Sequence, residues 1–194
     1  MQTQTKEIQS KLNPTSALQL LKDGNKRFVA AQETKRDLLQ QVEQTSTGQF
    51  PFATILSCID SRVSSELIFD QGIGDIFSVR IAGNFINEDI LGSMEFACKL
   101  AGTKVILVLG HTACGAVKGA CDNAKLGNLT AMLSKILPAV EQVKEPSESN
   151  QRNSSNLKFV NDVSKVNVEL SIARIRKESE VLREMENAGE IEIK

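Results

Sequence analysis

The sequence predicts an α/β protein in which helices flank a mostly parallel central β-sheet. Short apolar segments rich in β-branched residues alternate with amphipathic segments, as in chains that build parallel sheets. The clearest of these segments, 52–59 and 104–109, are almost continuously apolar, which is typical of strands covered on both faces. With 194 residues, the chain is expected to form a single domain over 1–194.

Residues 1–50 are expected to form an N-terminal helical arm. A helix over 15–32, capped by Thr15 or Ser16, would place its apolar side chains on one side: Leu18, Leu21, Phe28 and Val29. The polar residues 33–50 predict a short helix followed by a loop.

The rest of the chain is expected to alternate strands and helices and to contain one polar loop. In chain order, the expected elements are a strand at 52–59, a helical turn or two at 64–71, a strand at 75–81, a helix at 88–101, a strand at 104–109, helices at about 113–125 and 128–144, and one or two helices at 157–187. The Ser/Asn-rich residues 145–156 predict a surface loop, and residues 190–194 alternate like the start of a strand.

Composition narrows the classes of function. The net charge of -1, the pI near 6.0 and the absence of Trp and Tyr argue against nucleic-acid binding and against an anionic membrane surface. The polar N-terminus has no apolar core of a signal peptide, and no apolar run approaches the roughly 20 residues of a membrane helix. We therefore expect a cytoplasmic protein without nucleic-acid or membrane partners.

Two segments at the ends of predicted strands carry residues that bind metals. Cys58 closes the first strand, and His111 and Cys114 follow the third. Ligands of open α/β sheets bind at the carboxyl ends of the strands, so these side chains converge if the two strands are neighbours. Two thiolates and one imidazole suit Zn²⁺ and leave one tetrahedral position for water, as catalytic zinc sites do.

The residues alone leave other interpretations open. Cys98 or Cys121 could supply a fourth ligand, and buried cysteines are common as small hydrophobic residues. Asp60 and Arg62 strengthen the case for a reactive site because they are charged residues next to Cys58, although they could form a simple surface ion pair.

The spacing of these motifs resembles the β-class carbonic anhydrases. The shared features are C-x-D-S-R at 58–62, H-x-x-C-G at 111–115, and the segments GDIFSVRIAGN at 74–84 and ILGSMEFA at 90–97. The resemblance covers about residues 15–194. It implies an α/β fold, a zinc cofactor, and a homodimer or a higher homo-oligomer.

The resemblance also implies roles for individual residues. Cys58, His111 and Cys114 match the zinc ligands of the family, and Asp60 with Arg62 matches its catalytic dyad. In some members the equivalent aspartate binds zinc in a closed state, so Asp60 is a possible fourth ligand. A substrate pocket would include Gln49, Val63 and Phe77, although Val63 and Phe77 could equally serve core packing.

The implied reaction is the reversible hydration of CO₂ to bicarbonate and a proton by hydroxide formed on zinc, with CO₂/bicarbonate as the small-molecule substrate. Alternatives are a CS₂ or COS hydrolase on the same scaffold, a catalytically silent zinc-stabilised relative, and a redox-thiol protein. Family members usually continue past 190–194, so we expect the final edge strand to be missing here.

Overall fold

The computed structural model describes residues 3–194 and contains one parallel four-stranded sheet within them. Its strands are β1 (Ala53–Ser57), β2 (Ile76–Arg80), β3 (Val105–Leu109) and β4 (Glu192–Ile193), in the order β2-β1-β3-β4. All three strand pairings are parallel, which confirms the predicted fold class. β1 and β3 are neighbours, as convergence of the two metal-binding motifs requires.

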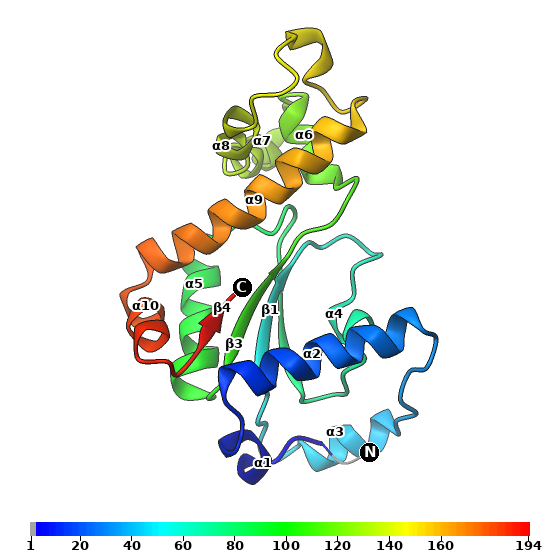
Figure 1. The fold of residues 1–194 in the computed structure, drawn as a ribbon, viewed down its shortest axis with the longest axis vertical. Coiled ribbons are helices and arrows are strands. Elements are labelled where there is room, and N and C mark those ends of the chain that lie inside the picture. The colour runs from blue at the N-terminus through cyan, green and yellow to red at the C-terminus, as the bar shows by residue number, and fades with distance from the viewer. Residues whose placement is uncertain (1–2) are drawn as a thin grey trace.

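Helices connect the strands and extend the fold beyond the sheet (Figure 1). They are α1 (Lys6–Ser10), α2 (Pro14–Val29), α3 (Leu38–Gln44), α4 (Ser65–Ile68), α5 (Glu88–Glu95) continued by a π-helical turn (Phe96–Leu100), α6 (Gly115–Cys121), α7 (Gly127–Leu133), α8 (Leu137–Gln142), a 3-10 turn (Ser149–Gln151), α9 (Leu157–Glu178) and α10 (Glu180–Asn187). No helix in residues 3–194 is both long and apolar enough to span a bilayer.

The sheet separates two apolar cores because successive side chains of β1 point to opposite faces. Ile55 packs with residues of α2 and α4 on one face, whereas Leu56 packs with α5, α9 and α10 on the other. A third core lies beyond the carboxyl end of the sheet, where α6, α7 and α8 pack against the first half of α9. Figure 1 shows α9 running from this group of helices down to α10 beside β4.

Two expectations about helix boundaries were wrong. Asn13, and not Thr15 or Ser16, caps α2, because its side chain accepts a hydrogen bond from the backbone N–H of Ser16 while Pro14 takes the first helical position. The predicted helix over 128–144 is two helices, because Pro138 lies in the first turn of α8 and cannot continue α7.

The apolar side of α2 is also narrower than expected. Leu21 is fully buried, but Phe28 and Val29 at the carboxyl end of the helix are exposed, Val29 to 77%. Both residues lie in the last turn of the helix, which ends at Val29 just before Ala31 adopts a positive φ of 53°.

Candidate metal centre

The metal-binding motifs occupy the loops that follow β1 and β3. The register of these strands pairs Ser57 with Leu109, so Cys58 and the segment beginning at Gly110 leave the sheet at the same edge. This arrangement is the one that parallel pairing dictates, because the carboxyl ends of parallel strands lie together. The predicted convergence of the motifs is therefore confirmed.

Cys58, His111 and Cys114 form a compact cluster at this edge. Their potential ligand atoms all lie within 4.8 Å of one another, and the sulfur atoms of Cys58 and Cys114 are 3.9 Å apart. Two thiolates on a tetrahedral zinc ion, each at about 2.3 Å, are separated by roughly 3.8 Å. The cysteines are buried and His111 is partly buried, so the cluster has both the donors and the spacing of a zinc site.

The ring of His111 is oriented for binding through one nitrogen. Its Nδ1 lies 3.0 Å from the carbonyl oxygen of Thr112, which can only accept, so Nδ1 carries the proton. Nε2 therefore bears the lone pair. It is buried and has no hydrogen-bond partner among residues 3–194. A buried, unpartnered nitrogen facing two sulfurs is accounted for by a metal ion.

The sulfur of Cys58 receives additional stabilisation. The backbone N–H of Gly83 donates to it at 3.3 Å. The hydrogen bond with Cys114 lowers the pKa of the Cys58 thiol; burial opposes this shift, and the Gly83 amide supports it. The shared hydrogen bond correspondingly raises the pKa of Cys114. The Gly83 amide thus favours negative charge on the Cys58 sulfur.

Asp60 and Arg62 form the predicted pair beside the cluster. Nε and Nη2 of Arg62 donate to the two carboxylate oxygens of Asp60 at 2.9 and 2.8 Å, and the backbone N–H of Arg62 adds a third hydrogen bond at 3.0 Å. These bonds lower the pKa of Asp60 well below its usual range. Oδ2 of Asp60 lies 3.9 Å from Nε2 of His111, so the carboxylate is adjacent to the cluster while both its oxygens face Arg62.

A second arginine supports this loop and was not identified from the sequence. Nε of Arg80 donates to the carbonyl oxygen of Cys58 at 2.9 Å, and its Nη2 donates to that of Asp60 at 2.8 Å. Arg80 ends β2, directly opposite Ser57. The sequence placed Arg80 in the segment 74–84 that resembles the family. It could not show which groups the side chain contacts, because those contacts depend on the pairing of β2 with β1.

The other two cysteines lie outside the cluster. Cys98 is buried in the π-helical turn, 3.3 Å from the hydroxyl of Thr103, and burial raises its pKa to about 11. Burial likewise raises the pKa of Cys121 to about 11. Among residues 3–194, the side chains close enough together to share a metal ion are those of Cys58, His111 and Cys114, so Cys98 and Cys121 are not candidates for a fourth ligand.

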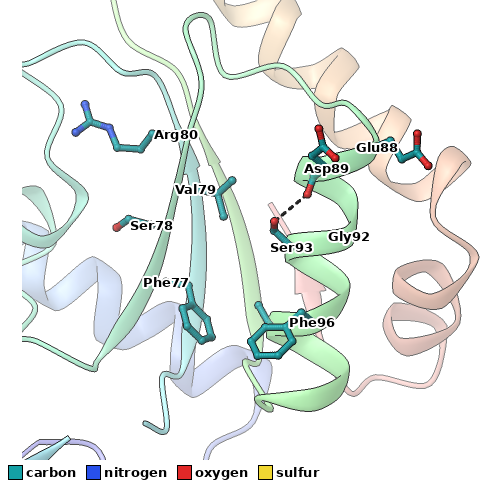
Figure 2. A pocket seen from close by; sticks show the side chains of 10 residues that line it. Phe77, Ser78, Val79, Arg80, Glu88, Asp89, Gly92, Ser93 and Phe96 are labelled. Carbon is teal, nitrogen blue, oxygen red and sulfur yellow. Dashed lines mark hydrogen bonds between the residues drawn. The ribbon is translucent and has the colours of Figure 1, made fainter. Parts of the chain in front are cut away.

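The three predicted pocket residues are not gathered in one place. Val63 is buried next to Asp60 and Arg62, and its backbone N–H donates a hydrogen bond to the carbonyl oxygen of Asp60 at 3.0 Å. Gln49 is exposed and precedes β1, at the end of the sheet opposite to Cys58. Phe77 pairs with Thr54, and its ring centroid lies 6.4 Å from that of Phe96 in the groove between β2 and α5 (Figure 2).

A different cavity adjoins the cluster. It has a volume of about 290 Å³ and is bordered by Cys58 and Asp60. Its lining is largely apolar and includes Ala82, Met132 and Leu133. The sequence did not identify this cavity, because α6 and α7 form its walls only after the chain has folded.

Comparison with protein families gives a match to the family described as carbonic anhydrase over residues 53–194. The chain is 41% identical over 136 residues to carbonic anhydrase 2 of Mycobacterium tuberculosis, a stretch covering 66% of this chain and 65% of that protein. It is 40% identical over 136 residues to a carbonic anhydrase of Mycolicibacterium smegmatis, with the same coverage. The chain thus spans just under two-thirds of the length of these relatives.

Solved structures of similar fold include two from fungi. One is the β-carbonic anhydrase CafA of Aspergillus fumigatus, with a TM-score of 0.68 and 26% identity over 92% of this chain and 82% of that one. The other belongs to a pair of tetrameric β-carbonic anhydrases of Sordaria macrospora, with a TM-score of 0.65 and 21% identity over 79% and 82%. The second match concerns the fold alone.

Proposed function

Since this chain belongs to the β-class carbonic anhydrase family, we propose that it catalyses the reversible hydration of CO₂ to bicarbonate and a proton. One observation carries the proposal: the Cys58–His111–Cys114 cluster lies beside an Asp60 carboxylate that is fixed by Arg62. The cluster provides the donors for a metal, and the pair provides a fixed carboxylate next to it.

Cys58, His111 and Cys114 would hold zinc in this enzyme. When bound, zinc supplies Lewis acidity that lowers the pKa of a water molecule and so yields a nucleophile at neutral pH. Two cysteine ligands leave less positive charge at the site than histidines would, so the zinc ion alone would acidify water less. A carboxylate that accepts a hydrogen bond from the nucleophile would help to orient it.

Asp60 is suited to that role. Its lowered pKa keeps it ionised, so that it can only accept hydrogen bonds. Oδ2, the carboxylate oxygen 3.9 Å from His111 Nε2, is available to accept one from the attacking oxygen and to aim that oxygen at carbon. Arg62 grips both carboxylate oxygens and keeps Asp60 from becoming a metal ligand itself.

The apolar cavity beside Asp60 is suited to CO₂, which is itself apolar. Val63 is buried in the loop that carries Asp60 and Arg62. Gln49 and Phe77 lie toward the other end of the sheet, so within this proposal they meet substrate only at the site of a second copy. We accordingly propose a homodimer or a higher homo-oligomer; the structures from Sordaria macrospora are described as tetrameric.

The proton released in each turnover needs an acceptor. Histidine is the usual shuttle near neutral pH, and the only histidine of this chain belongs to the metal cluster. The proton therefore leaves through water, buffer, a carboxylate or the N-terminal region. We propose that the reaction takes place in the cytoplasm.

Stopped-flow hydration of CO₂ tests the function. The zinc-loaded protein should hydrate CO₂, and Asp60→Ala should lose at least about a hundredfold in rate, the low end of what one positioned proton acceptor contributes. Asp23→Ala is the matched control, because Asp23 also has an ion-pair partner, Lys26, but lies on the surface of α2. Zinc binding without CO₂ hydration would refute the proposal, and hydrolysis of CS₂ or COS in its place would identify a different enzyme.

A further inference from the structure

The buried side of α9 contains polar side chains where an amphipathic helix would carry apolar ones. Ser164, Asn167 and Ser171 are exposed to only 7%, 3% and 2%. Burying such groups costs free energy unless each one finds a hydrogen-bond partner. Their partners should therefore explain why the sequence retains them.

Two of these three side chains reach out of the helix to the same turn. Nδ2 of Asn167 donates to the carbonyl oxygen of Gly83 at 2.7 Å, and Oγ of Ser171 donates to that of Asn84 at 3.2 Å. Ser164 differs, because its hydroxyl donates to the carbonyl oxygen of Val160 within α9. The contacts of Asn167 and Ser171 span more than 80 residues of sequence.

The turn that receives these hydrogen bonds has a demanding backbone. Gly83 and Asn84 both have positive φ, at 84° and 39°, and the turn is closed by a hydrogen bond from the N–H of Asn84 to the carbonyl oxygen of Ile81. A non-glycine residue with positive φ costs free energy that the surroundings must offset. The side chains of Asn167 and Ser171 anchor this turn through its two carbonyl oxygens.

The same turn contacts a proposed metal ligand. The N–H of Gly83 donates to the sulfur of Cys58, so a continuous chain runs from Asn167 through the Gly83 backbone to a thiolate. α9 also reaches the other ligand loop, because Oδ1 of Asn161 accepts from the N–H of Ala113, whose φ is 53°. One helix therefore contacts both loops that carry the ligands.

We propose that Asn167 and Ser171 are positioning residues of the metal centre, which hold the Gly83–Asn84 turn so that the Gly83 amide stays on the Cys58 sulfur. The amide takes up part of the thiolate charge and fixes the direction of the sulfur. Groups outside the ligand shell that orient ligands typically change metal affinity by about 10–100-fold when removed. The inference rests on the zinc site of the proposed function, but not on the reaction.

Metal binding provides the test. The zinc dissociation constant would be measured by competition with a chromophoric chelator, and the cobalt-substituted protein would report the sulfur–metal bond through its charge-transfer absorption. Asn167→Ala should weaken zinc binding by about 10–100-fold and shift the cobalt spectrum. Ser171→Ala should act in the same direction to a smaller extent, and it tests the proposal if Asn167→Ala does not fold.

Ser164→Ala is the matched control for Ser171→Ala. It also removes a buried serine hydroxyl from α9, but the hydroxyl of Ser164 bonds within the helix and not to the Gly83–Asn84 turn. It should leave both the zinc affinity and the cobalt spectrum unchanged. The proposal is overturned if Ser171→Ala and a folded Asn167→Ala lower only the thermal stability of the metal-free protein and keep wild-type zinc affinity. Tight zinc binding by the wild type without CO₂ hydration would refute the proposed function and leave this inference standing.

Discussion

Replacing Gly83 by alanine tests the packing that holds the metal ligands. Gly83 is buried between the metal cluster and the core formed by α6–α8, and its φ is 84°. A Cβ atom at this position would lie 2.4 Å from Cδ1 of Ile136 and 3.3 Å from Cβ of Ala116. Ile136 is fully buried, so its side chain has little room in which to move away.

The expected loss of stability follows from two terms. Forcing an alanine into the left-handed region costs about 1–2 kcal/mol. Inserting a methyl group into a packed core adds about 1–3 kcal/mol. Together these give a decrease of roughly 2–5 kcal/mol in the free energy of unfolding, which corresponds to a Tm lower by about 5–15 °C for a chain of this size.

Urea unfolding of the metal-free protein at fixed subunit concentration measures this decrease. Gly92→Ala is the control: Gly92 is exposed on α5 and a Cβ there would meet no described atom within 4 Å. This variant should gain about 0.5–1 kcal/mol because alanine favours a helix. Equal stabilities of Gly83→Ala and the wild type would refute the packing argument.

Three further predictions concern charge. Arg62→Ala should slow CO₂ hydration in stopped flow, because Asp60 is then free to turn onto the metal; a wild-type rate would contradict the role of the pair. Although burial raises the pKa of Asp70, hydrogen bonds from Arg36, Arg27 and Thr34 lower it more, so the folded-state pKa lies below the unfolded value. The ionised Asp70 therefore contributes to the free energy of unfolding above about pH 4, and this contribution is lost as the pH falls further. Asp70→Asn should therefore be less stable than the wild type by urea titration at pH 7, and a constant difference down to pH 3 would count against this reasoning. Turnover should also rise with buffer concentration, since the only histidine lies in the metal cluster; a flat dependence would point to an internal proton shuttle.

Local patterns were sufficient to predict most of the fold. The apolar runs at 52–59 and 104–109 identified β1 and β3, and parallel pairing then brought Cys58 and His111 to one edge. Helix ends were harder to predict. Both Asn13 and Thr15 are good capping residues, and only the position of Pro14 at the start of the helix distinguishes them.

The parts of the site that were missed depend on long-range contacts. Arg80 and Gly83 reach the ligand loop across a strand pairing and a turn, and Asn167 reaches it from more than 80 residues away. A signal was nevertheless present in α9, where Asn167 and Ser171 follow the spacing of the buried side. Polar residues at buried helical positions indicate a specific partner, although the sequence does not say which one.

X-ray absorption at the zinc edge tests the central claim most directly. The protein loaded with one zinc ion per chain should show two sulfur neighbours at about 2.3 Å and two nitrogen or oxygen neighbours at about 2.0 Å, and Cys114→Ser should lose one of the sulfurs. A first shell without sulfur, or one with four sulfurs, would contradict a site built from Cys58, His111 and Cys114.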